Sequence, residues 1–172
     1  REKNQLMRIF LIGFMGCGKS TIGKSLAKTL QFNFTDLDNY IEKRTSKSIK
    51  QIFTEKGEQY FRGLERDFLQ EEILKENTVI ATGGGTPCFY NNMQIILDNG
   101  ISVYLRMQAK DLAKRLCKEK NKRPLIDKLS CNKLDEFISS RLIEREKFYL
   151  KATHVINAKK VNIDTLRNLV LG

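Results

Sequence analysis

The sequence has no tryptophan, only two prolines and a single histidine, His154, among its 172 residues. Four cysteines are present, but no two of them are spaced as a CxxC pair, and one histidine adds little to a ligand set. A zinc site, which needs several cysteine or histidine ligands, is therefore not expected. His154 stands in an apolar stretch, and we interpret it as a structural residue rather than a catalyst.

Disulfide-stapled domains carry more cysteines in a shorter chain, so four cysteines in 172 residues predict no disulfide framework. This usage indicates a reducing compartment, and we expect a cytoplasmic protein. Long apolar runs are also missing, because no segment approaches the ~18 apolar residues of a membrane span. The polar start has no signal-peptide core. Met7 is a candidate native start, which would make residues 1–6 a tag remnant or a short extension.

Acidic residues are outnumbered, because 31 lysines and arginines face 20 aspartates and glutamates, for a net charge of +11. Such an excess attracts anions, among them nucleic acids and nucleotide phosphates. A basic nucleic-acid-binding module is therefore one alternative to an enzyme. Against it, the sequence has no RRM, zinc-finger or helix-turn-helix signature and no aromatic residues interleaved with a basic patch. We expect weak, salt-sensitive DNA binding at most.

Apolar residues make up 41% of the chain, which suffices for one core, and we expect residues 1–172 to form a single domain. Short apolar runs predict strands at residues 7–12, 32–35, 78–81, 101–105 and 154–157. Helical spacing predicts helices at residues 19–30, at 38–57 as two short helices, and at 57–75, 89–98, 110–117, 134–150 and 162–170. This alternation predicts a three-layer α/β fold with a mostly five-stranded parallel sheet.

Residues 13–20 read GFMGCGKS and fit the pattern GxxxxGK[ST] at every required position. The segment follows a buried strand and precedes an amphipathic helix, which is the context of a phosphate-binding P-loop. Gly13, Gly16 and Gly18 allow the backbone to turn sharply and to point its N–H groups at phosphate oxygens. The helix N-terminus adds a partial positive charge, so the segment predicts nucleotide binding.

Two side chains of this loop carry chemistry of their own. Lys19 can reach the β- and γ-phosphates of ATP, and the Ser20 hydroxyl can bind Mg²⁺. Cys17 and Thr21 complete the nucleotide-binding segment, and Cys17 needs no role beyond its small size.

Asp36 and Asp38 stand two residues apart at the end of the second expected strand. Residues spaced in this way in an extended chain point to the same side, so both carboxylates can face a cleft at the carboxyl end of the sheet. Asp36 can hold Mg²⁺ through water, and Asp38 can orient a substrate hydroxyl and accept its proton. Turn or N-cap duty is an equal alternative, and Asp38 is well placed to cap the next helix.

Arg62 and Glu65 share one face of the helix expected at residues 57–75. An arginine aligned with apolar positions points partly inward and needs an anionic partner, which Glu65 or a ligand can supply. Arg145 stands in a similar position within residues 134–150. Two inward arginines on different helices can clamp a substrate carboxylate. A structural ion pair for each arginine is the alternative, and spacing alone favours it.

Gly83, Gly84 and Gly85 directly follow a buried strand, where three glycines have no packing purpose. They allow a ligand to approach the backbone closely, and a flexible turn is the alternative. Residues 118–132 are the longest irregular stretch and contain Arg123. A polar loop of this kind suits a lid in which Arg123 neutralises charge during transfer, and an ordinary loop is the alternative.

Six segments together resemble the shikimate kinases over essentially the whole chain. They are GFMGCGKST at residues 13–21, DLD at 36–38, FRGLE at 61–65, GGG at 83–85, KRPL at 122–125 and REKFY at 145–149. Any one of them is a weak signal, but all six in the family's order and at about its spacing are specific.

The resemblance implies a P-loop fold of the nucleoside-monophosphate-kinase type. It also implies ATP-dependent phosphorylation of the 3-hydroxyl of shikimate to shikimate 3-phosphate, a step toward chorismate and aromatic amino acids. For the nucleotide, the resemblance implies phosphate and Mg²⁺ binding by Lys19 and Ser20, phosphate contact from the lid by Arg123, and a position near adenine for Arg115. It implies water-mediated Mg²⁺ binding by Asp36. For the substrate, it implies hydroxyl contact by Asp38, carboxylate binding by Arg62 and Arg145, and ring contact by Gly83, Gly84 and Gly85.

Asp38, Lys19 and Arg123 are then the expected catalytic residues, in a monomer that has shikimate as its partner and needs neither nucleic acid nor a membrane. The chain departs from the family after Arg145, where members commonly carry a proline, and in a lid with one clear arginine among lysines. A related kinase acting on gluconate would share the phosphate loop, the lid and the clamp. The glycine triplet together with DLD favours shikimate.

Overall fold

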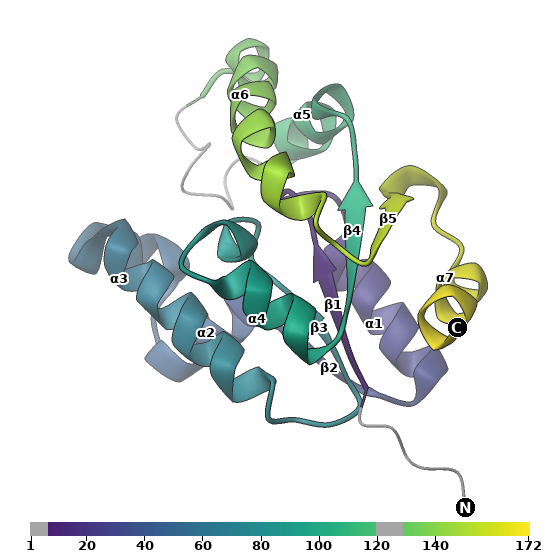
Figure 1. The fold of residues 1–172 in the computed structure, drawn as a ribbon. Helices are drawn as coiled ribbons and strands as arrows, with labels where there is room; N and C mark the ends of the chain where they lie inside the picture. The colour runs from purple at the N-terminus through teal and green to yellow at the C-terminus, as the bar shows by residue number, and fades with distance from the viewer. Residues whose placement is uncertain (1–6, 120–128) are drawn as a thin grey trace, which may run out of the picture.

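The computed structural model describes residues 7–119 and 129–172, and there five parallel strands form one sheet in the order β2-β3-β1-β4-β5 (Figure 1). The strands are β1 (Arg8–Ile12), β2 (Asn33–Asp36), β3 (Thr78–Ala81), β4 (Ile101–Arg106) and β5 (His154–Asn157). The expected parallel sheet of five strands is confirmed, and each strand lies within a residue or two of its predicted range.

Seven α-helices and two short 3₁₀-helices connect the strands in the described residues. They are α1 (Lys19–Leu30), α2 (Leu37–Thr45), α3 (Ile49–Glu72), η1 (Thr86–Cys88), α4 (Asn92–Asn99), α5 (Ala109–Lys118), α6 (Cys131–Tyr149), η3 (Ala158–Lys160) and α7 (Ile163–Leu171). The sequence had predicted a boundary between helices at Gly57. The structure has a kink there instead, because Gly57 takes the non-helical angles φ 82° and ψ 171° inside α3.

The core occupies both faces of the sheet. On one face Leu11 and Val103 pack among residues of α1 and α7, and on the other Phe10 and Tyr104 pack among residues of α3, α4 and α6. Figure 1 shows α1 and α7 side by side on the first face and α4 over the second. Central strands buried on both sides explain the nearly continuous apolar runs that predicted them.

The sheet order places the phosphate loop in the middle of the molecule. β1 pairs with β3 on one side and with β4 on the other, so the chain that leaves Ile12 emerges between the ends of two neighbouring strands. In parallel α/β sheets, ligands bind at the carboxyl ends of the strands, where successive connections diverge to opposite faces.

One disulfide is present, although cysteine usage predicted no disulfide framework. Cys117 at the end of α5 and Cys131 at the start of α6 form a disulfide, with their Cα atoms 5.5 Å apart. The packing of α5 against α6 brings these residues together, and spacing alone carries no trace of that contact. Cysteine usage therefore no longer supports a reducing compartment. Within the described residues, we find no helix that combines the length and the apolarity required to cross a membrane.

Candidate active site

A cavity of about 930 Å³ opens at the carboxyl ends of β1, β2 and β3. Nearly all of the site residues predicted from the sequence line it: Gly16, Gly18, Lys19, Ser20, Thr21, Asp36, Asp38, Arg62, Gly83, Gly84, Gly85, Arg115 and Arg145. Arg123 lies outside the described residues, as does most of the expected lid at residues 118–132. The fold therefore gathers residues from α1, α2, α3, α5, α6 and two loops around one space.

The phosphate loop joins β1 to α1 through two glycines in left-handed conformations, Gly16 at φ 83° and Gly18 at φ 102°. Lys19 is only 9% exposed, and its Nζ donates to the carbonyl oxygens of Gly13 at 2.8 Å and Phe14 at 3.1 Å. Gly13 thus contributes an acceptor from behind the loop rather than a surface of the cavity. The lysine lies folded over its own loop, with its charge next to backbone oxygens.

Cys17 is buried, and its side chain packs in the apolar cluster that α1 forms with the sheet. Its backbone N–H donates to the carbonyl of Phe14 at 3.2 Å and so closes the turn of the loop. The side chain therefore has the packing role that a small residue at this position suits.

Ser20 and Asp36 bring two oxygen ligands together beside the loop. The Ser20 hydroxyl donates to Oδ2 of Asp36, while Oδ1 accepts from the backbone N–H of Asn39 at 3.2 Å. Asp36 is therefore the N-cap of α2, and the cap that we had considered for Asp38 belongs to its neighbour. Asp38 lies in the first helical turn rather than on an extended chain, yet both carboxylates line the cavity as expected.

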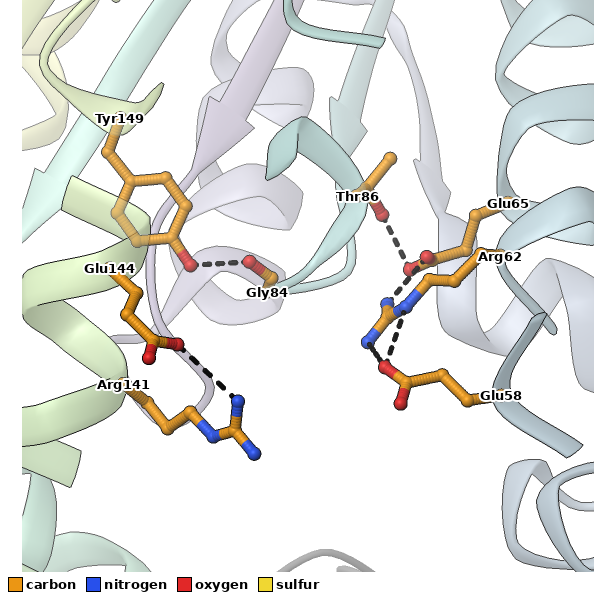
Figure 2. A network of polar contacts seen from close by, with 8 residues as sticks. All are labelled: Glu58, Arg62, Glu65, Gly84, Thr86, Arg141, Glu144 and Tyr149. Atoms are coloured by element: carbon orange, nitrogen blue, oxygen red, sulfur yellow. Dashed lines mark hydrogen bonds and ion pairs between the residues drawn. The ribbon is translucent and has the colours of Figure 1, made fainter. Parts of the chain in front are cut away.

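Arg62 is buried at the centre of a polar network in α3, in which Glu65 is also buried and Glu58 is exposed (Figure 2). Its Nη1 donates to Oε2 of Glu65 at 2.6 Å, and its Nε and Nη2 donate to Oε1 of Glu58 at 3.3 and 3.1 Å. Burial by itself lowers the pKa of Arg62, but the carboxylates of Glu65 and Glu58 outweigh it, so the pKa stands above its ordinary value. The guanidinium is thus a fixed cation.

Glu65 is 1% exposed, and a second donor satisfies it. The Thr86 hydroxyl donates to its Oε1 at 2.7 Å, from the loop that follows β3. Burial raises the pKa of Glu65 above its ordinary value, although Arg62 and Thr86 act in the opposite direction. The predicted ion pair between Arg62 and Glu65 is confirmed. Both residues line the cavity, so the pair does not exclude a ligand contact by Arg62.

Arg145 approaches the cavity from α6. Its guanidinium carbon lies 5.1 Å from the centre of the Phe14 ring, and its Nη1 is buried without a hydrogen-bond partner among the described residues. A buried cationic donor in this state is costly unless a ligand completes it. A carboxylate in the cavity is the simplest such ligand, since Arg62 borders the same space.

The glycine triplet separates the two arginines. A Cβ on Gly84 would lie 3.3 Å from Nη1 of Arg145, and one on Gly85 would lie 2.4 Å from Nη1 of Arg62. The Tyr149 hydroxyl donates to the carbonyl of Gly84 and ties this loop to α6 (Figure 2). The close approach of both guanidinium groups explains why these positions lack side chains.

Comparison with known proteins agrees with this geometry. The family model described as shikimate kinase matches residues 15–170. A shikimate kinase of Parabacteroides distasonis is 45% identical over 156 residues, which cover 91% of this chain and 90% of the relative. The chain belongs to the shikimate kinase family.

Solved structures of the shikimate kinase family superpose closely. A shikimate kinase from Bacteroides thetaiotaomicron matches with a TM-score of 0.92 and 40% identity, covering 98% of this chain and all of that one (100%). A shikimate kinase from Acinetobacter baumannii in complex with shikimate matches with a TM-score of 0.87 and 32% identity, covering 98% and 92%. A gluconokinase from Sinorhizobium meliloti, at 12% identity and a TM-score of 0.58, shares the fold alone.

Arg115, whose implied position is near adenine, lies beside the phosphate loop. Its Nη1 donates to the carbonyl of Gly16 at 3.3 Å from α5. Sequence reasoning missed three residues that hold parts of the candidate site, although none of them lines its cavity: Glu58, Thr86 and Tyr149. Glu58 could have been found, because it stands four residues from Arg62 on the same helix, whereas the contact of Tyr149 with Gly84 joins two distant segments. Thr86 left no signal, since its contact with Glu65 arises only from the fold.

Proposed function

We propose that the chain transfers the γ-phosphoryl group of ATP to the 3-hydroxyl of shikimate and forms shikimate 3-phosphate, a step toward chorismate and aromatic amino acids. One observation carries the proposal. A phosphate loop and two inward arginines face the same cavity, and Nη1 of Arg145 is buried there without a partner among the described residues. A ligand with a carboxylate at one end and a hydroxyl at the other would complete both sides.

The carboxylate end rests on Arg62 and Arg145. Of the five N–H donors of a guanidinium, Arg62 uses one on Nε and one on Nη2 for Glu58, and one on Nη1 for Glu65. One donor on Nη1 and one on Nη2 are left, and they suit the two oxygens of a carboxylate. Arg145 supplies a second positive charge on the other side of the glycine loop.

The hydroxyl end rests on Asp38, which would orient the attacking oxygen and accept its proton. Phosphoryl transfer passes through a loose transition state, so most of the catalysis comes from position and charge. Lys19 would exchange the carbonyls of Gly13 and Phe14 for phosphate oxygens and neutralise charge as transfer proceeds. Arg123 of the expected lid would add a second cation, and Arg115 would lie near the adenine.

The oxygens of Ser20 and Asp36 fit Mg²⁺. This ion retains several waters and takes only one or two protein ligands beside substrate phosphates. In residues 7–119 and 129–172 we find no group of three acidic, cysteine or histidine ligands. Bound there, Mg²⁺ would supply charge to the β- and γ-phosphates, with Ser20 as a direct ligand and Asp36 acting through water. We further propose a single-domain monomer that needs neither nucleic acid nor a membrane. Its proposed compartment is the cytoplasm, where the bridge between Cys117 and Cys131 would be kept reduced.

The test is ADP release by the purified protein with ATP and Mg²⁺, with shikimate, gluconate, quinate or no acceptor. We expect ADP release with shikimate alone. ADP release with another acid instead would support a kinase of different substrate specificity. No ADP release with any acceptor would overturn the proposal. Arg145→Ala should abolish shikimate binding and preserve nucleotide binding. Arg141→Ala is the matched control one turn away on α6, because Arg141 pairs with the exposed Glu144.

A further inference from the structure

Phe89, which no motif of the sequence singled out, lies against the central arginine of the site. The guanidinium carbon of Arg62 is 4.2 Å from the centre of the Phe89 ring, the shortest cation–π distance among the described residues. Arg62 also approaches Phe61, its neighbour in the chain, but only to 5.3 Å. A guanidinium over an aromatic face is attracted by the ring quadrupole, most strongly where water is excluded.

Phe89 follows a loop that hydrogen bonds hold in place. In η1, the N–H of Cys88 donates to the carbonyl of Gly85 at 2.9 Å, and the side chain of Asn92 donates to the carbonyl of Thr86 at 2.9 Å. Pro87 restricts the backbone between them. Because this segment is continuous with the glycine triplet, the backbone that carries the ring is held next to the cavity.

The contacts of Arg62 divide into two kinds. Glu58 and Glu65 accept hydrogen bonds, and such bonds fix the guanidinium within its own plane. The guanidinium carbon lies over the ring of Phe89, and the Cα of Gly85 comes so close that a Cβ would lie within 2.8 Å of three guanidinium atoms. The hydrogen bonds alone would leave the plane free to tilt.

We propose that Phe89 is a positioning residue for the substrate carboxylate: its ring holds the guanidinium plane of Arg62 so that the remaining Nη1 and Nη2 donors face the carboxylate together. The inference rests on the proposed function, because it concerns how that function's carboxylate is held. A two-pronged contact loses most of its advantage when its plane tilts, so the ring contributes to the affinity for a planar anion without touching it.

Packing does not account for this aromatic residue. Phe89 is half-buried and belongs to none of the three apolar clusters formed by the described residues. It borders a second, smaller cavity of about 370 Å³ that Phe137 and Arg145 also line. A side chain that fills no core yet lies 4.2 Å from a buried cation is placed for that cation.

The experiment compares Phe89→Leu, Phe89→Met and Phe89→Tyr with the wild-type enzyme. Leucine and methionine keep apolar bulk and remove the ring face, whereas tyrosine keeps both. We expect the leucine and methionine variants to raise KM and Kd for shikimate by about fivefold to thirtyfold, the range of a partly desolvated cation–π contact. The Kd for ATP should be unchanged, kcat should change less than KM, and tyrosine should restore affinity.

Phe137→Leu is the matched control, because it removes a half-buried ring from the same small cavity but lies against Arg141 rather than Arg62. Its shikimate affinity should equal that of the wild type. Unchanged shikimate affinity in both Phe89→Leu and Phe89→Met would overturn the inference, and so would equal losses of ATP and shikimate affinity. If the wild-type enzyme itself neither binds nor phosphorylates shikimate, the proposed function fails instead.

Discussion

The Thr86 hydroxyl donates to one oxygen of Glu65 at 2.7 Å, while the other oxygen accepts from Arg62 at 2.6 Å. The carboxylate is almost fully buried, so each oxygen depends on the donor it has. The loop after β3 and the helix α3 are thereby joined through a single carboxylate that also holds Arg62.

Thr86→Val should destabilise the protein, because it keeps the shape of the side chain and leaves a buried carboxylate oxygen without its donor. We expect a loss of about 1–3 kcal/mol in the free energy of unfolding, measured by urea denaturation. Thr86→Ser keeps the hydroxyl and should lose less. Equal stability of the valine variant and the wild type would show that the contact contributes nothing.

The cost of Thr86→Val should depend on pH. Burial raises the pKa of Glu65, and a carboxyl whose pKa is raised by folding stabilises the folded state most when protonated. That contribution is present below the pKa of the unfolded chain and is lost as pH rises through the pKa of the folded state. Without the Thr86 donor the pKa rises further, so the destabilisation should be larger at neutral pH than in acid. A pH-independent difference between the two unfolding curves would contradict this.

Gly85→Ala should weaken shikimate binding by moving Arg62. The added Cβ would lie 2.4 Å from Nη1 of that arginine. The backbone itself tolerates alanine, because φ at Gly85 is −88°. We expect a shikimate KM raised at least about tenfold, as a displaced bidentate contact implies. Gly63→Ala is the control, because its Cβ meets nothing within 4 Å in α3. It should keep its activity and gain about 0.5–1 kcal/mol of stability.

Asp38→Asn should fold and bind ATP yet turn over slowly, since the amide can orient a hydroxyl but accepts no proton. A fall in kcat of roughly 10²–10⁴ is the range for loss of a general base, measured by steady-state ADP release. Asp67→Asn is the control, because Asp67 is exposed on α3 beside Arg66 and its substitution removes the same charge. It should leave kcat unchanged. Near-normal turnover in Asp38→Asn would remove this residue from the mechanism.

The cysteines make a prediction that needs no variant. With Cys117 and Cys131 joined, the unfolded and unreduced protein should give two thiols per chain, and four after reduction. In the folded protein both remaining thiols should react slowly, because Cys17 is buried and burial raises the pKa of Cys88 to about 11. Four thiols before reduction would rule out the disulfide.

The sequence predicts the parts of this molecule that depend on local pattern. The buried strands, the phosphate loop and the inward orientation of Arg62 all follow from spacing that can be read within one segment. The pairing of Thr86 with Glu65 and of Cys117 with Cys131 depends on distances between segments, which sequence spacing does not contain. Asp36 and Asp38 fall between these cases, since both line the cavity but the one expected to cap α2 does not.

The bonds from Lys19 to the carbonyls of Gly13 and Phe14 have a consequence for how the phosphate loop should be probed. This lysine braces its own loop through two hydrogen bonds and also offers a positive charge to phosphate. Phosphate oxygens in the loop would compete with these two carbonyls for the same ammonium group. Removing the lysine takes away the brace together with the charge, so weak nucleotide binding by such a variant would measure both losses at once.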